Sequence, residues 1–217
     1  MPEIAVITPE DFMHYLTGNA QQLGATLVDA LGRYRHRVFV EHLGWQLPNA
    51  THGAEWDAFD TPGTVYVVAL CDPGRIAGCA RLLPTTGPYL LADVFPELLN
   101  GTPCPRSAAV WELSRFAAFD PESPPARGHT LGSPAALDLL RVSLREAAQR
   151  GARQLVSVSP VAIARILHRG GFAHARLGPP REVAGQQLFA CSFNVAPDED
   201  GPGGLEATPS ALEVEAQ

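Results

Sequence analysis

Residues 109–118 read Ala109-Val110-Trp111-Glu112-Leu113-Ser114-Arg115-Phe116-Ala117-Ala118, an apolar run that contains one carboxylate and one guanidinium. The run is apolar enough to form a buried strand, in which successive side chains point to opposite faces. On a regular strand Glu112 and Ser114 therefore share one face while Arg115 points to the other, unless a β-bulge re-aims a side chain. Because a charged side chain is almost never buried without a partner, either this strand lines a cleft or Glu112 and Arg115 form a buried ion pair.

The composition is typical of one soluble globular domain. The chain has 217 residues, of which 46% are hydrophobic and 18% charged, and this length allows a sizeable core. It contains no apolar run of 18 residues, and its acidic N-terminus lacks the basic segment of a secretory signal. The cysteines lack C-x-x-C spacing and nearby histidine pairs, which predicts free thiols, a cytoplasmic protein and no metal site. They are Cys71, Cys79, Cys104 and Cys191.

The charge is unevenly distributed. The net charge is −7, but residues 197–217 alone carry −6 and no arginine, so the rest of the chain is nearly neutral. All 16 basic residues are arginine, and eight of them lie within 141–181 beside a single acid, Glu146. This basic segment indicates either an anionic partner or a solvated helix face. Nucleic acid is the less favoured partner, because no aromatic residues or binding motif accompany the arginines.

Hydrophobic periodicity and turn residues predict both helices and strands. We expect helices over 21–44, 134–150 and 160–169, a hairpin over 64–71 and 76–84, and strands over 109–118, 154–158, 172–177 and 187–195. A first strand lies at 3–7 or at 12–17, and Gly32 is a candidate break in the first helix. Hairpins on both sides of a helical crossover predict an α/β fold with a mixed sheet flanked by helices. We divide the chain into an N-terminal extension (1–11), one domain (12–196) and an acidic, disordered tail (197–217).

Several charged residues lie where burial or a long functional loop is expected. Three are cations and three are carboxylates, and they are Arg35, Asp57, Asp60, Arg81, Glu112 and Arg115. Such a balanced set can form a charge-compensated network that lines a polar pocket. The sequence contains no G-x-S-x-G, no G-x-x-x-x-G-K and no G-x-G-x-x-G motif, so neither a serine hydrolase elbow nor a phosphate-binding glycine loop is indicated.

Four blocks of sequence carry a resemblance to a known family. They are Arg35-x3-Phe39-x5-Trp45, Glu55-x-Asp57-x-Phe59-Asp60, the run RLLPTTGPY from Arg81 to Tyr89, and WELSRF from Trp111 to Phe116. In this order and spacing they resemble the acyl-homoserine lactone synthases, the bacterial autoinducer synthases, over residues 12–195. The resemblance implies a GNAT-like acyltransferase fold, with a mixed, mostly antiparallel sheet that opens into a V-shaped cleft.

The resemblance also implies a reaction. An acyl chain passes from acyl carrier protein to the amine of S-adenosylmethionine, the homoserine moiety lactonises, and methylthioadenosine leaves, producing a quorum-sensing signal. S-adenosylmethionine is a substrate here, and no cofactor is implied. The catalytic residues implied are Glu112, Arg115, Asp57, Asp60, Arg81 and Ser114, and those expected to bind S-adenosylmethionine are Arg35, Phe39, Trp45, Asp57 and Phe116.

Elementary chemistry gives these residues roles. The amine must lose a proton before it attacks the thioester, and Glu112 is the expected base. Asp57 or Asp60 can hold the ammonium, and Trp45 can face the sulfonium as a cation–π partner. Backbone N–H groups at a bulge near Phe116 can stabilise the tetrahedral oxyanion.

The donor side is expected in the second half of the chain. The acyl pocket would be lined by Trp111, Val156, Ser157, Val158, Ile163, Ile166 and Leu167. Acyl carrier proteins are acidic, and the arginines expected to dock one are Arg141, Arg145, Arg150, Arg153, Arg165 and Arg169. Ser157 stands where relatives that take 3-oxo chains often carry threonine, which leaves the 3-substituent open, together with chain length and oligomeric state.

Two alternatives compete with this interpretation. A general N-acyltransferase would take acyl-CoA and would place a (Q/R)-x-x-G-x-(G/A) turn at a helix N-terminus to bind pyrophosphate. The run from Arg127 to Gly132 has Thr130 where the first glycine belongs, which counts against this class. A non-catalytic binding module on the same fold is the other alternative, and the complete charge network counts against it.

Overall fold

The computed structural model describes residues 13–47, 49–50, 52–72, 75–119, 121 and 133–195. The alternative first strand at 3–7, the run at 127–132 and the tail at 197–217 lie outside these residues. Five side chains inside them are also not described, namely those of Asp72, Ala162, Arg165, Ile166 and Arg169.

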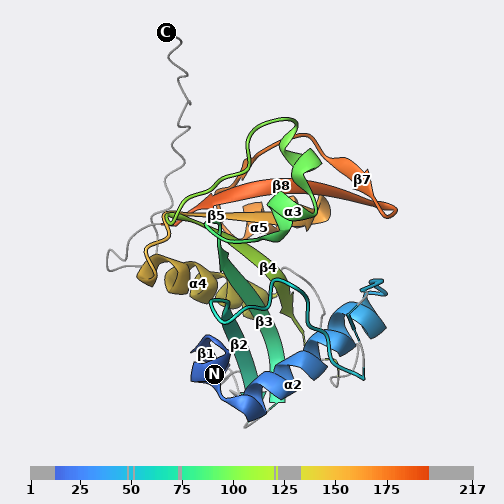
Figure 1. Ribbon diagram of the computed structural model, residues 1–217, viewed down its shortest axis with the longest axis vertical. Coiled ribbons are helices and arrows are strands. Elements are labelled where there is room, and N and C mark those ends of the chain that lie inside the picture. Colours follow the sequence, from blue (N-terminus) through green and yellow to red (C-terminus); the bar gives the residue numbers. More distant parts are fainter. Residues whose placement is uncertain are drawn as a thin grey trace, which may run out of the picture.

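One mixed sheet organises the chain (Figure 1). Its strands are β1 (His14–Gly18), β2 (Val65–Asp72), β3 (Arg75–Pro84), β4 (Val110–Ala118), β5 (Gln154–Pro160), β6 (Ala175–Arg176), β7 (Arg181–Val183) and β8 (Gln186–Asn194). The spatial order is β1-β2-β3-β4-β5-β8-β6, and β7 also pairs with β8. The pair β4–β5 is parallel and the other pairs of described strands are antiparallel. The predicted mixed, mostly antiparallel sheet is confirmed.

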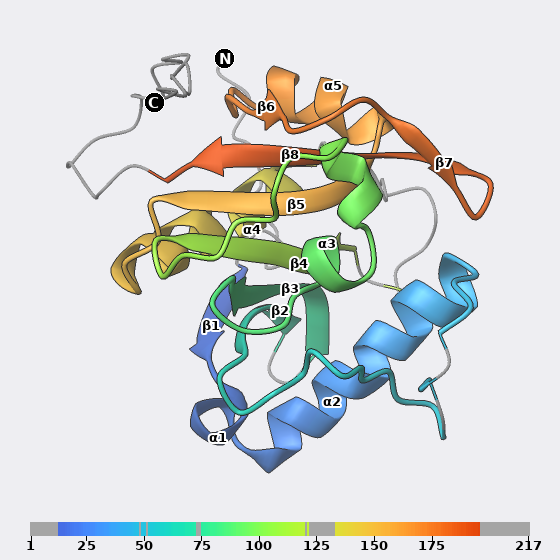
Figure 2. The same cartoon turned by 45° about the horizontal axis from the view of Figure 1, so that its top comes forward.

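Helices cover both faces of this sheet (Figure 2). They are α1 (Ala20–Leu23), α2 (Ala25–Arg35), the π-helix η2 (His36–His42), α3 (Leu90–Asp93), the 3-10 helix η3 (Pro96–Leu99), α4 (Pro134–Gln149) and α5 (Ala162–Arg169). Side chains alternate along β2, so Val65, Val67 and Ala69 pack in the cluster with α4, whereas Tyr66 and Val68 pack in the cluster with α2. Among the described residues, no helix combines the length and the apolar character that crossing a membrane requires.

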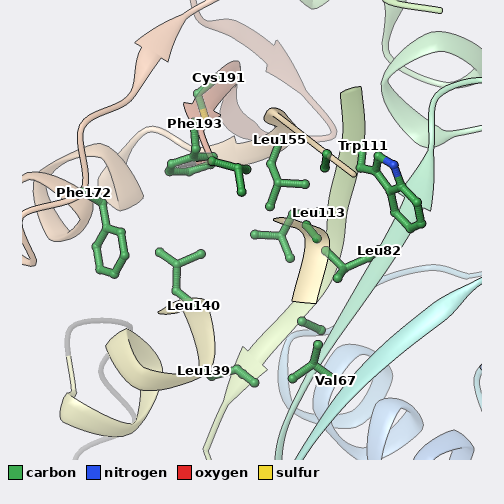
Figure 3. Close-up of a cluster of buried hydrophobic side chains, with 14 of the residues drawn as sticks. Val67, Leu82, Trp111, Leu113, Leu139, Leu140, Leu155, Phe172, Cys191 and Phe193 are labelled. Atoms are coloured by element: carbon green, nitrogen blue, oxygen red, sulfur yellow. The ribbon is translucent and has the colours of Figure 1, made fainter. Parts of the chain in front are cut away.

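The largest core cluster lies between the sheet and helices α4 and α5. Figure 3 shows Leu139 and Leu140 of α4 facing Leu113 of β4 and Leu155 of β5. Phe172 belongs to the same cluster, and its backbone N–H donates to the Leu167 carbonyl at the end of α5. Because Phe172 is drawn into this core, the strand expected at 172–177 is reduced to the two residues of β6.

The first helix differs from the prediction of one helix over 21–44. It is divided at Gly24, which has φ +80° and precedes α2, and it finishes as the π-helix η2. Gly32 does not break the helix. A Cβ at Gly32 would lie 2.7 Å from the Trp56 indole nitrogen, so the glycine lets this ring pack directly against α2.

Strands β4 and β5 separate after a short parallel pairing. Their parallel pairing joins Val110 to Gln154, Trp111 to Leu155 and Glu112 to Val156, and stops there. Strand β4 continues to Ala118 and β5 to Pro160, so the two strands diverge beyond Glu112 (Figure 1). The separation of the two strands therefore starts at Glu112, the carboxylate that the sequence placed at the centre of the site.

Candidate active site

A β-bulge re-aims the second half of β4. Cys79 of β3 pairs with Ala117 and Arg81 pairs with Ser114, so β4 has one residue more than β3 between these two pairs. Arg115 lies at this bulge with φ +48°, a left-handed conformation that is uncommon outside glycine. The buried Cys79 thiol donates to the Arg115 carbonyl at 3.2 Å, which fixes the bulge from the neighbouring strand.

The bulge brings Arg115 to the sheet face opposite α4. Trp111 and Leu113 pack towards α4, and after the extra residue Phe116 does so too. Glu112 and Arg115 hydrogen-bond instead to segments on the other side, at residues 90–91 and 55–57. The two charged side chains thus share one face without forming an ion pair with each other, which settles the alternatives that the sequence left open.

Arg115 and Arg35 share a buried carboxylate, Glu55. Arg35 Nε donates to Glu55 Oε2 at 2.6 Å, and Arg115 Nη2 donates to Glu55 Oε1 at 3.0 Å. The two Nη groups of Arg35 also form a bidentate pair with Asp60, at 2.8 and 3.0 Å. The sequence block that carries the family resemblance includes Glu55, but no role was predicted for it. Its position within five residues of Asp57 and Asp60 could have indicated that it belongs to the same network.

Arg81 extends the network to β3 and β4. Its Nη1 donates to Asp57 at 2.6 Å, and its Nε donates to Ser114 Oγ at 3.1 Å. Asp57 also accepts from Arg115 Nη2 at 2.6 Å, so one carboxylate bridges two cations. Arg81 is fully buried, and its Nη2 has no hydrogen-bond partner among the described residues. Such a donor is costly to leave unpaired and is well suited to bind an acceptor on a substrate.

Mutual pairing keeps Glu55, Asp60 and Arg35 ionised. Burial alone would raise the pKa of Asp60 and of Glu55, but hydrogen bonds and charges from the arginines hold both pKa values below their ordinary range. Burial alone would lower the pKa of Arg35, but Asp60 and Glu55 raise it instead. Glu55, Asp60 and Arg35 therefore stay charged in the neutral pH range.

Glu112 differs from the network in its pKa. Its side chain is 1% exposed, and its two oxygens accept the backbone N–H groups of Leu90 and Leu91 at 3.1 and 2.7 Å. Burial raises the pKa of Glu112 to about 7, although these two N–H groups and the charges of Arg81 and Arg115 act in the opposite direction. A carboxyl group with this pKa can both accept and release a proton near neutral pH.

Aromatic rings cover the cationic end of the network. Phe39 and Trp45 stack with ring centroids 4.9 Å apart, and the Arg115 guanidinium carbon lies 5.7 and 5.8 Å from their centroids. The π-helix η2 places Phe39, which it buries together with Val38. Trp45 follows η2, and its backbone N–H donates to the Phe39 carbonyl at 2.9 Å. As a correction, Phe116 does not lie with Phe39 and Trp45, because it packs on the α4 side of the sheet.

The residues predicted to form the acyl pocket divide between two faces. Trp111, Ile163 and Leu167 belong to the cluster on the α4 side, and by strand alternation Ser157 points to the same side as Leu155. As a correction, Val156 and Val158 pack on the opposite face, in the cluster formed with α3, so they cannot share a pocket wall with the others. The side chain of Ile166 lies outside the described set.

A cavity of about 480 Å³ opens on the α1 side of the network. Its walls include two network carboxylates, Asp57 and Asp60, but not Phe39, Trp45 or Phe116. The remaining lining residues are Asn19, Ala20, Gln21, Val28, Trp56, Thr61, Pro62 and Tyr66. In the described part of the chain, no group of three His, Cys, Asp or Glu side chains is placed to hold a metal ion.

The arginines predicted to dock a carrier protein differ in their pairing. Arg141 pairs with Asp138 at 2.7 Å, and Arg150 pairs with Glu146 at 2.6 Å. Arg145 and Arg153 are exposed and form no ion pair with a described carboxylate. The side chains of Arg165 and Arg169 lie outside the described set.

Comparison with known proteins identifies the family. A model of the autoinducer synthase family matches residues 19–200. The acyl-homoserine-lactone synthase of Acinetobacter nosocomialis is 44% identical over 184 residues, which cover 84% of this chain and 100% of that protein. The chain belongs to the autoinducer synthase family. It is thus an acyl-homoserine lactone synthase, an acyltransferase that makes quorum-sensing signals.

Solved structures agree with this assignment. The structure of TofI, in a ternary complex with an inhibitor and MTA, has a TM-score of 0.72 and 42% identity, covering 83% of this chain and 91% of that one. The structure of BjaI, described as a CoA-dependent acyl-homoserine lactone synthase, with SAM and isopentyl-CoA, has a TM-score of 0.72 and 27% identity, covering 85% and 83%. The fold of the synthase is therefore the GNAT-like fold of these enzymes, as the sequence predicted.

Proposed function

We propose that the synthase transfers an acyl chain from acyl carrier protein to the amine of S-adenosylmethionine, then forms the lactone and releases methylthioadenosine. One observation carries this proposal. Glu112, a buried carboxyl group with a pKa of about 7, lies where β4 and β5 diverge, and the fixed charge network lies on the same face of the sheet.

Glu112 acts as the base in this proposal. It takes a proton from the ammonium of S-adenosylmethionine, and the free amine attacks the thioester carbonyl. The tetrahedral intermediate collapses to the amide, whose nitrogen releases one of its two protons to solvent and keeps the other. The carrier sulfur takes the proton held by Glu112 and departs as a thiol. The substrate carboxylate then attacks the carbon that bears the sulfonium, so that the C–S bond breaks and neutral methylthioadenosine leaves. Positioning within one enclosed site suffices for this internal step.

The network supplies the contacts for the charged substrate. Asp60 already accepts hydrogen bonds from Arg35, Tyr66 and the Asp57 amide, so the more exposed Asp57 is the better partner for the ammonium. The unpartnered Nη2 of Arg81 is the donor for the carboxylate or the thioester oxygen.

The stacked rings of Phe39 and Trp45 supply a face for the sulfonium. Two relatives support this assignment, since TofI binds MTA and BjaI binds SAM.

The acyl chain is placed on the other side of β4. The apolar cluster between α4, α5 and the diverging strands contains Trp111, Ile163 and Leu167, and Ser157 adds a hydroxyl 3.5 Å from that of Ser159. These groups suit an aliphatic chain with a polar contact near the thioester. We place the enzyme in the cytoplasm, whose reducing conditions suit its four free cysteines.

Docking of the carrier protein is assigned mainly to Arg145 and Arg153, which among the described docking candidates are exposed and form no ion pair with a described carboxylate. Arg145→Gln should raise the KM for acyl carrier protein severalfold and leave the KM for S-adenosylmethionine unchanged, because a rim charge acts on encounter with an acidic partner. Arg33→Gln, which changes an exposed arginine of α2, is the matched control. If the KM for acyl carrier protein is the same in both variants, Arg145 does not take part in docking the carrier protein.

Acyl-CoA is the second candidate donor, because BjaI is CoA-dependent. The class of reaction is tested by mass spectrometry of organic extracts from cells that express the synthase or its Glu112→Gln variant. We expect a set of acyl-homoserine lactones from the first culture and almost none from the second. Their absence from both cultures would refute the proposed activity, and equal amounts would refute the role of Glu112.

A further inference from the structure

The carboxylate of Glu112 depends on a segment that has little rigidity of its own. Its oxygens bind the N–H groups of Leu90 and Leu91 at 3.1 and 2.7 Å. These two residues begin α3, which is only four residues long, and so short a helix is not stable by itself. Something outside α3 must therefore hold the two N–H groups in place.

Tyr89 provides an anchor immediately before α3. It is fully buried, and its hydroxyl donates to the Pro105 carbonyl at 2.6 Å. The Arg106 guanidinium carbon lies 5.3 Å from the centroid of the Tyr89 ring, and its Nη1 donates to the Gly87 carbonyl at 2.8 Å. Burial raises the pKa of Tyr89 to about 12, so the hydroxyl stays a donor throughout the pH range of enzyme assays.

We propose that Tyr89 is a positioning residue for catalysis, whose hydroxyl bond to Pro105 holds the Leu90 and Leu91 amides against Glu112. The proposal rests on the proposed function of Glu112 as the base. Tyr89 need not touch the substrate to act in this way. It fixes the backbone that orients the carboxylate, and it keeps that carboxylate at the point where β4 and β5 separate.

The consequence is a dependence on pH. The charged and titratable groups that face Glu112 are Arg81 from β3, Arg115 from β4 and Tyr89 itself. The two arginines belong to the paired network and do not move with Tyr89. The hydrogen bonds from the Leu90 and Leu91 N–H groups favour the ionised carboxylate and so lower the pKa of Glu112, whereas burial raises it. Weakening these hydrogen bonds therefore shifts the titration of Glu112 to higher pH.

The test compares Tyr89→Phe with Tyr34→Phe. Tyr34 is also fully buried, and its hydroxyl donates to the Phe119 carbonyl at 2.8 Å, so the control loses a similar bond away from Glu112. We expect the acidic limb of the kcat/KM profile to move up by about half to one pH unit in Tyr89→Phe, as the loss of about one hydrogen bond implies. The limb of Tyr34→Phe should stay in place.

Two readouts separate this proposal from the one on which it rests. The first is the Glu112 titration, followed by carbon NMR of labelled carboxyl groups and assigned with Glu112→Gln, and the second is the pH–rate profile. A Glu112 titration that is unchanged in Tyr89→Phe overturns the positioning role. A titration that moves while the pH–rate profile does not supports the positioning role and overturns the assignment of Glu112 as the base.

Discussion

The pH dependence of stability should reveal the buried carboxyl group of Glu112 directly. The pKa of Glu112 is raised from its ordinary 4.5 to about 7 in the folded protein. Between these values the folded chain retains a proton that the unfolded chain has released. Its contribution to stability is therefore fully present below pH 4.5, and it is lost as the pH rises through 7.

The size of the effect follows from the shift. Each pKa unit corresponds to ~1.36 kcal/mol, so the whole contribution is about 3 kcal/mol, of which about 2.5 kcal/mol falls between pH 5 and pH 8. Glu112→Gln removes this titration and leaves the other ionisable groups in place. The difference in the free energy of unfolding, variant minus wild type, should therefore be about 2.5 kcal/mol larger at pH 8 than at pH 5.

Urea unfolding of both proteins at the two pH values measures this difference. Contributions from Glu55 and Asp60, whose pKa values are lowered, are common to both proteins and cancel. If the stabilities of wild type and variant change in parallel from pH 5 to pH 8, Glu112 does not titrate near 7 and the argument for a base poised at neutral pH fails.

Three further substitutions test the network and its surroundings. Asp60→Asn should lower the free energy of unfolding by about 3 kcal/mol in urea titrations, because it leaves the buried Arg35 without its bidentate partner; a loss below 1 kcal/mol would contradict this. Phe39→Ala should raise the KM for S-adenosylmethionine about tenfold, whereas Phe116→Ala should not, because the rings lie on opposite faces; equal effects would reject that division. Gly32→Ala should cost about 1–3 kcal/mol, since the added Cβ would meet an indole nitrogen at 2.7 Å, and an unchanged melting temperature would show that the indole is free to move.

Local pattern was enough to predict most elements and every member of the network except Glu55. The strand predicted over 109–118 is β4, the hairpin is β2 and β3, and the helix that begins with Ser133-Pro134 is α4, where the Ser133 side chain accepts the Ala136 N–H. Of the six residues predicted as one set, the three arginines and the two aspartates do form one network. The sixth, Glu112, is bound instead by the backbone N–H groups of Leu90 and Leu91. Charged residues in apolar surroundings must find partners, so their association could be deduced without coordinates.

The direction of side chains needed the structure. Whether β4 carries a bulge depends on its register against β3. The sequence of β4 by itself does not determine that register. The side on which Val156 lies depends on where α3 and α5 cross the sheet. An alternating pattern divides the side chains of β5 between two faces of the sheet. The chain segments that connect the strands decide which of these faces packs against α5. Phe116 was misplaced for the same reason, because the bulge at Arg115 shifts the alternation by one residue.

The donor and acceptor chemistry is tested most directly with purified protein, S-adenosylmethionine and a matched pair of donors. The same acyl chain is supplied on acyl carrier protein or on CoA, and methylthioadenosine and acyl-homoserine lactone are both quantified. The account predicts one methylthioadenosine for each lactone, a higher kcat/KM with the carrier-protein donor, and a tenfold fall in rate per pH unit below 7 as Glu112 is protonated. Lactone formation with no acidic limb near pH 7, or methylthioadenosine without lactone, would contradict it.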